Sequence, residues 1–92
     1  MRAVEFKRSF DRTYRRLAPK DQPKVDQAIE RLLTSLEDGR IPQGLGLKRL
    51  REDQWEIRVD LSLRIGFRMR KNHVEFAVVG DHEAIKRFLK NI

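Results

Sequence analysis

The middle of the chain alternates between apolar and charged residues, as expected for strands of a sheet with one buried face. Residues 55–70 read WEIRVDLSLRIGFRMR. Successive side chains of an extended chain point to opposite faces, so this segment predicts two strands with a shared apolar face. That face comprises Trp55, Ile57, Val59, Leu61, Leu63, Ile65, Phe67 and Met69. The other face is rich in arginine, which predicts a sheet that packs on helices through one side and offers cations on the other.

The first forty residues predict a short strand followed by two helices. The strand begins at Val4, and apolar residues then recur at helical spacing. This first helical stripe consists of Phe6, Phe10, Tyr14 and Leu17. The second helix has the strongest periodicity in the chain, with a cap expected at Asp21 and an end at Gly39. The loop that should follow contains Pro42, Gly44 and Gly46.

The last quarter predicts a hairpin turn around Asn72, an apolar interior strand over residues 74–79 and a final helix capped by Asp81. The buried stripe of that helix is Ile85, Phe88, Leu89 and Ile92. The predicted order is strand, helix, helix, three strands, helix. We therefore expect one small α+β domain spanning residues 1–92, with an antiparallel-type sheet packed on two N-terminal helices and a C-terminal helix.

Charge narrows the class of partner. The chain has 21 Lys and Arg against 14 Asp and Glu, a net charge of +7, which favours nucleic acid, an acidic protein or anionic lipid. No apolar run reaches the roughly 18 residues that cross a bilayer, and the start lacks the core of a signal peptide, so a cytoplasmic protein without a membrane partner is expected. Without cysteine, and with only two histidines, no metal and no cofactor are expected.

Four short motifs resemble the RelE/ParE toxin superfamily of bacterial and archaeal toxin–antitoxin pairs. They are LKRLRE at residues 47–52, WEIR at 55–58, RIGF at 64–67 and VVGDHEAIKRFLKNI at 78–92. The resemblance implies a compact α+β domain that a cognate antitoxin holds inactive in a toxin–antitoxin hetero-oligomer. RelE-like members of this superfamily cleave mRNA in the ribosomal A site, whereas ParE-like members poison DNA gyrase.

The resemblance also implies residues for metal-free RNA cleavage, in which the 2′-hydroxyl attacks the adjacent phosphate. That reaction needs a base, an acid and cations. Arg64 falls at the position of a catalytic arginine that stabilises the phosphorane, and Arg58 would assist it. His82 matches a histidine of YafQ-like members, and an unperturbed imidazole, with a pKa of about 6.5, can act as general acid or base. Asp60 matches an aspartate that would orient this histidine or act as a base.

The sequence departs from the family pattern at two of these positions. Glu56 stands where RelE has lysine and YafQ-like proteins have histidine, so it would serve as a base or be structural. Lys86 stands near the terminal aromatic of the family, and it would donate a proton or bind phosphate but cannot stack on a base. Residues expected to grip the RNA backbone or rRNA are Lys48, Arg49, Arg51, Arg68 and Arg70.

Several of these residues also fit an ordinary structural role. Arg68 and Arg70 fit a solvated strand, His82 a first helical turn and Asp60 a turn between strands. Arg64 fits a ligand site better, because Gly66 beside it clears space for a ligand or backbone. The basic residues of the first helix are most simply its solvent-exposed face; they are Lys7, Arg8, Arg12, Arg15 and Arg16.

Three classes of function remain in view. The leading one is a ribosome-dependent mRNA endonuclease that inhibits translation. The second is a ParE-like gyrase inhibitor, and the third is a catalytically inert binding module with the same fold. In each class the positive charge predicts an antitoxin with an acidic, partly disordered segment.

Overall fold

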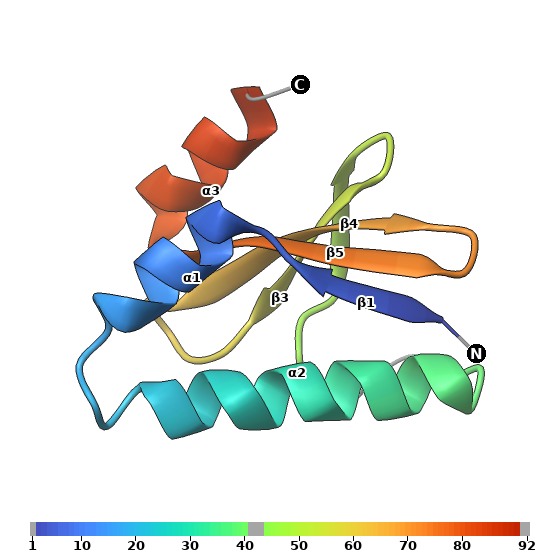
Figure 1. The fold of residues 1–92 in the computed structure, drawn as a ribbon, viewed down its shortest axis with the longest axis horizontal. Coiled ribbons are helices and arrows are strands. Elements are labelled where there is room, and N and C mark those ends of the chain that lie inside the picture. The colour runs from blue at the N-terminus through green and yellow to red at the C-terminus, as the bar shows by residue number, and fades with distance from the viewer. Residues whose placement is uncertain (1, 41–43, 91–92) are drawn as a thin grey trace.

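The computed structural model describes residues 2–40 and 44–90, which form eight elements (Figure 1). They are β1 (Ala3–Phe6), α1 (Arg8–Arg15), α2 (Gln22–Glu37), β2 (Lys48–Arg51), β3 (Gln54–Arg58), β4 (Arg64–Arg70), β5 (His73–Gly80) and α3 (His82–Lys90). The α+β class, the two N-terminal helices and the C-terminal helix are confirmed. The order differs from the prediction by one further strand, β2.

The strands form a single sheet in the order β1-β5-β4-β3-β2. The pairs β3–β4 and β4–β5 are antiparallel, as predicted, and the additional strand β2 pairs antiparallel with β3, but β1 pairs with β5 in parallel. The prediction of an antiparallel-type sheet is therefore wrong at this one edge. The connection from β1 to β5 contains two helices and three strands, and so it is long enough for the crossover that a parallel pair needs. Because β5 has a neighbour on each side, its predicted interior position is confirmed.

Strand β2 was missed because its sequence, KRLR, lacks the alternation that marks a half-buried strand. Three of its four side chains are exposed. Its backbone pairs with β3, with Lys48 opposite Glu56 and Arg49 opposite Trp55. Long-range pairing rather than local pattern therefore makes this segment a strand.

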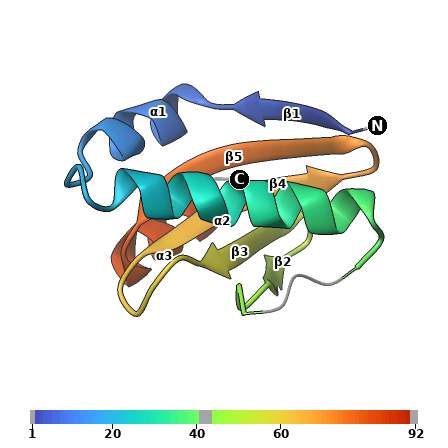
Figure 2. The same ribbon diagram turned by 90° about the horizontal axis from the view of Figure 1, so that it is seen from below.

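One face of the sheet packs on α2, which runs across it in Figures 1 and 2. The core between them contains Val25, Leu32, Ile57, Ile65, Phe67 and Phe76. Trp55 packs against this core, as its parity predicted. Leu61 does not, because residues 59–62 bend between β3 and β4 and leave its side chain 93% exposed. In the turn Val59 and Leu63 still pack against the core, so the predicted apolar face is wrong at Leu61.

Helix α1 continues from β1 along the second half of β5. The Lys7 N–H donates to the Phe76 carbonyl at 2.9 Å, and the Ser9 hydroxyl donates to the Ala77 carbonyl at 2.6 Å. The Val79 N–H in turn donates to the Thr13 hydroxyl at 3.1 Å. Beyond the end of β1, the hydroxyls of Ser9 and Thr13 therefore form the hydrogen bonds to the backbone of β5 that a neighbouring strand would otherwise form.

The predicted turn and cap residues have mixed outcomes. Asp81 caps α3, since its carboxylate accepts the Ala84 N–H at 3.0 Å, and Asn72 and Gly39 adopt φ of 61° and 68° in their turns. Asp21 makes no side-chain cap of α2 and instead pairs with Lys24. Phe6 belongs to β1 rather than to α1. The expectations for Pro42 and Ile92 lie outside the described residues. None of the described helices combines the length and the apolarity of a membrane span.

Candidate active site

Three strands place the leading candidates at the same end of the sheet. Arg58 ends β3, Arg64 begins β4 and Gly80 ends β5, and in register Arg64 lies between the other two. Helix α3 begins with His82, two residues after Gly80. Neighbouring strands are about 4.8 Å apart, and two residues span at most about 7 Å. The backbones of Arg64 and His82 therefore lie at the same end of the sheet.

Arg64 is held by Glu56 across the sheet. An Arg64 Nη1 donates to Glu56 Oε2 at 2.9 Å, and the Glu56 residue is only 7% exposed. In register Glu56 lies opposite Gly66, on the face of the sheet that α3 covers. A buried carboxylate needs such a partner, and the pair fixes the direction of the guanidinium. The structure thus gives Glu56 a positioning contact with Arg64.

Cations outnumber carboxylates around this ion pair. Arg58 lies directly opposite Arg64 in the register, and like charges in such a pair repel. Arg58 is exposed and makes no ion pair within residues 2–40 and 44–90. Lys48 lies opposite Glu56 and so projects from the same face of the sheet. The arrangement favours a bound anion, which would relieve the repulsion.

Helix α3 adds His82 and Lys86 to this end of the molecule. The two residues are four apart in the helix and therefore share one side of it, and both are exposed. Among the residues that the structure describes, Lys86 pairs only with the exposed Glu83, at 3.7 Å. Both side chains thus remain accessible to a ligand.

Asp60 serves the turn between β3 and β4. Its Oδ1 accepts the N–H groups of Ser62 at 2.9 Å and Leu63 at 2.8 Å, and its Oδ2 lies 3.5 Å from the Lys24 amine. The Ser62 hydrogen bond is the largest cause that lowers the pKa of this carboxyl. A low pKa weakens a general base. The sequence left open whether Asp60 is a catalytic residue or a turn residue. Its contacts in the structure are those of a turn residue.

The remaining basic candidates lie on other parts of the sheet. Arg68 and Arg70 lie toward the opposite end of β4 from Arg64, and both contact Asp53, at 3.1 and 2.7 Å. The hydrogen bond from Arg70 is the main cause that lowers the pKa of Asp53. Sequence reasoning missed Asp53, whose partners follow only from the strand pairing. Arg49 and Arg51 are exposed on the edge strand β2, where Arg49 Nε donates to the Glu52 carbonyl at 2.6 Å.

The space over Gly66 holds a side chain of the protein itself. A Cβ at this position would lie 2.8 Å from Phe88 Cδ2 and 2.9 Å from Val78 Cγ1. The expectation of room for a ligand is thus wrong, because α3 packs its ring there. The buried Gln54 amide also donates to the Phe88 carbonyl at 2.9 Å. These two contacts hold α3, and with it His82, against the sheet.

Comparison with solved structures identifies the fold. No protein-family model and no curated protein sequence matches the chain. The RelE structure in the RelB–RelE antitoxin–toxin complex from Methanococcus jannaschii has a TM-score of 0.71 at 16% identity, covering 92% of this chain and 98% of that one. YafQ from Escherichia coli gives 0.65 at 14%, with the same coverage. The YoeB dimer from Staphylococcus aureus gives 0.66 at 18%, covering 88% and 97%. This chain therefore has the fold of the RelE-like toxins.

Proposed function

We propose that this chain is the toxin of a type II toxin–antitoxin pair and a metal-free, ribosome-dependent mRNA endonuclease of the cytoplasm. The observation that carries the proposal is the meeting of Arg58, Arg64 and His82 at one end of the sheet, beside the buried Glu56. The RelE-like fold supports it, because the chain aligns over nine tenths of its length with RelE and YafQ.

In this proposal the scissile phosphate lies between the guanidinium groups and the first turn of α3. The 2′-hydroxyl attacks the adjacent phosphorus, the bond to the 5′-oxygen breaks, and a cyclic phosphate and a free 5′-hydroxyl result. Arg64 and Arg58 stabilise the negative charge of the phosphorane. His82 takes the proton from the attacking hydroxyl or gives one to the leaving oxygen, and in the latter case water accepts the proton of the hydroxyl.

The remaining candidates support these three. Glu56 is a positioning residue in this scheme, because its carboxylate is already bonded to Arg64. Lys86, one turn beyond His82, binds a neighbouring phosphate or supplies the second proton. Lys48 holds the RNA backbone from the neighbouring strand. Asp60 has no part in the reaction, since its contacts belong to the turn.

The same proposal includes an antitoxin. The RelE neighbour is in complex with RelB, and YafQ is also known in complex with DinJ. With a net charge of +7, this chain would bind an antitoxin with an acidic segment that folds against the basic surface. Such a complex weakens as salt is added.

The test is to map cleavage of a reporter mRNA by primer extension, after induction in cells and with purified ribosomes. We expect His82→Ala to lower the cleavage rate by roughly 10²- to 10⁴-fold through loss of proton transfer. We expect Arg64→Ala to lower it by about 10²- to 10³-fold through loss of charge stabilisation. Full cleavage and growth arrest in the Arg64→Ala/His82→Ala double variant would refute the assignment.

Two controls separate chemistry from folding. Lys71→Gln removes a cation at the turn between β4 and β5, far along the sheet from Arg64, and should cleave as wild type does. Arg64→Ala leaves Glu56 buried without its partner, so Glu56→Gln/Arg64→Ala removes that unpaired charge and should stay folded yet inactive. If the wild-type protein leaves mRNA intact while cleaved DNA accumulates on gyrase, the ParE-like class replaces this proposal.

A further inference from the structure

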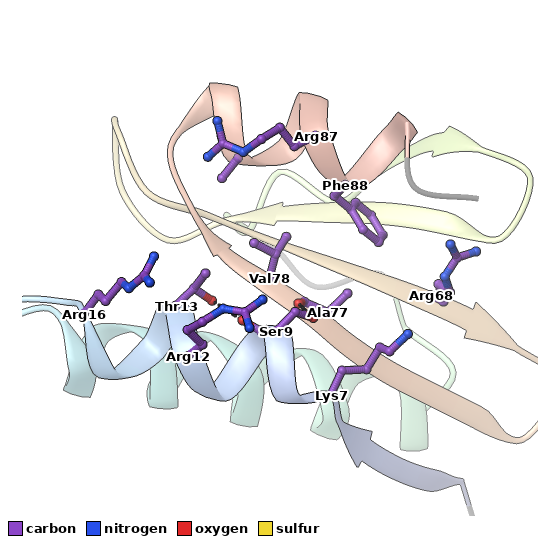
Figure 3. Close-up of a pocket in the computed structure, with 11 residues that line it drawn as sticks. Lys7, Ser9, Arg12, Thr13, Arg16, Arg68, Ala77, Val78, Arg87 and Phe88 are labelled. Carbon is purple, nitrogen blue, oxygen red and sulfur yellow. Dashed lines mark hydrogen bonds between the residues drawn. The ribbon is translucent and has the colours of Figure 1, made fainter.

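A second basic site lies on the far side of α3 from the proposed catalytic residues. Between α1 and α3 the surface forms a cleft of about 520 Å³, floored by Ala77 and Val78 of β5 (Figure 3). Its lining includes five cationic side chains and no carboxylate. These cations are Lys7, Arg12, Arg16, Arg68 and Arg87.

Three of these five cations are not neutralised by the protein. Arg12, Arg16 and Arg87 make no ion pair in the part of the chain that the structure describes. Lys7 approaches the half-buried Glu75 only at 4.0 Å. Arginines gathered without carboxylates repel one another and raise the local potential, so an anion bound between them is stabilised.

Both walls of the cleft are fixed before any ligand binds. The α1 wall is attached to β5 through the hydroxyls of Ser9 and Thr13, which contact backbone groups of Ala77 and Val79 at 2.6 and 3.1 Å. The α3 wall is held by Phe88, whose ring packs over Gly66. The cleft is therefore preorganised, which reduces the entropy lost on binding.

The shape of the cleft fits a chain of phosphates rather than a single one. Arg12 in α1 and Arg16 at its C-cap are four residues apart and line the α1 side of the cleft, while Arg87 lines it from α3 (Figure 3). A second hollow on α1 shares Arg12 and Arg16 and adds Arg8, Arg15 and one carboxylate, Asp11, so an excess of positive charge continues around the helix. Guanidinium groups bind phosphate oxygens in a bidentate manner, and spaced arginines follow the backbone of a single strand.

We propose that the α1–α3 cleft binds the phosphate backbone of single-stranded RNA at a site distinct from the catalytic end. Ala84, Arg87 and Phe88 share the side of α3 that faces the cleft, whereas the helical spacing places His82 and Lys86 on the other side. The proposal deepens the nuclease assignment and rests on RNA as its substrate. It gives the RNA a contact surface that continues past the scissile bond.

The experiment measures binding of a fluorescently labelled single-stranded RNA oligonucleotide by anisotropy over a range of salt. It uses the Arg64→Ala/His82→Ala background, in which the RNA is not cut. Each lost phosphate contact reduces the slope of log K against log salt by about 0.7 for a single strand. We therefore expect Arg12→Gln/Arg16→Gln to lower the slope by about 1.4 and to weaken binding by roughly 10- to 30-fold at 0.1 M salt. Arg87→Gln should lower the slope by about half as much.

The matched control removes the same charge elsewhere. Lys20→Gln/Arg40→Gln also changes the net charge by two, at exposed positions outside the cleft, and should bind RNA nearly as the parent does. If both double variants weaken RNA binding equally, the cleft is not the binding site and the effect is one of net charge.

The remaining outcomes separate this inference from the proposed function. If the cleft variants bind RNA normally while the wild type still cuts mRNA, the cleft is refuted and the nuclease assignment stands. If the wild type cuts no mRNA but the cleft variants lose RNA binding, the nuclease assignment fails and the cleft stands. Poly-L-glutamate of similar length, bound as tightly and lost in the same variants, would refute RNA as the specific ligand.

Discussion

Replacing Gly66 with alanine should destabilise the protein through one steric contact. The new methyl carbon would lie 2.8 Å from Phe88 Cδ2 and 2.9 Å from Val78 Cγ1, closer than carbon atoms approach without displacement. Both neighbours are held in packed elements, so either α3 or the sheet must shift. Overpacking of this kind costs about 1–3 kcal/mol. In a domain of this size that cost lowers the melting temperature by roughly 4–24 °C.

The contact can be isolated with a double-mutant cycle. Phe88→Ala alone should cost about 3–5 kcal/mol, because it empties the space above the glycine. In that background the added methyl meets only Val78, so Gly66→Ala should cost at least about 1 kcal/mol less than it does in the wild type. Urea denaturation followed by the fluorescence of Trp55, the only tryptophan, gives all four free energies of unfolding. Equal costs of Gly66→Ala in both backgrounds would refute the steric argument.

Two further predictions concern polar contacts. The folded-state pKa of Asp53 lies below its ordinary value of 3.8, chiefly through the Arg70 hydrogen bond, so its contribution to stability is complete above pH 3.8 and is lost as the pH falls through the folded pKa. Asp53→Asn should therefore be less stable than wild type at pH 7 but converge with it in acid, and a constant difference in urea midpoint at pH 7, 4 and 3 would contradict this. Thr13→Val should cost about 1–3 kcal/mol, because it removes the acceptor of the buried Val79 N–H. Thr13→Ser keeps the hydroxyl and should lose far less stability. Thermal denaturation and hydrogen exchange at the Val79 amide would measure the two losses. Equal losses of stability in the two variants would contradict a stabilising role for this hydrogen bond.

Local pattern was sufficient for the elements that have a buried stripe or a buried face. Apolar spacing predicted α2 and α3, and alternation predicted which side of β3 and β4 faces the core. The same alternation failed at Leu61. The sequence keeps alternating through the bend between β3 and β4, but the backbone there is no longer extended, so odd-numbered side chains need not point to the core. The sequence of β2 does not alternate, so this strand can be recognised only from its pairing with β3.

The sequence named candidate residues for a site, but it could not give their contacts. Resemblance indicated Arg64 and His82, and the register then placed them at one end of the sheet. That Glu56 holds Arg64 depends on a cross-strand neighbour eight residues away, which no local pattern encodes. Three arginines of the α1–α3 cleft, Arg12, Arg16 and Arg87, come from helical segments at opposite ends of the chain. On each helix alone they are ordinary exposed charges, and only tertiary packing turns them toward one another.

The contacts of β5 with the N-terminal segment have a consequence for the order of folding. Ala3 pairs with His73, and the Ser9 hydroxyl reaches a carbonyl 68 residues further along the chain. During synthesis β1 must therefore stay unpaired until β5 has emerged. Such distant pairings are slow to form, because the loop between them has to close first. The sheet thus stays incomplete until β5 has been translated, and it acquires β1 late.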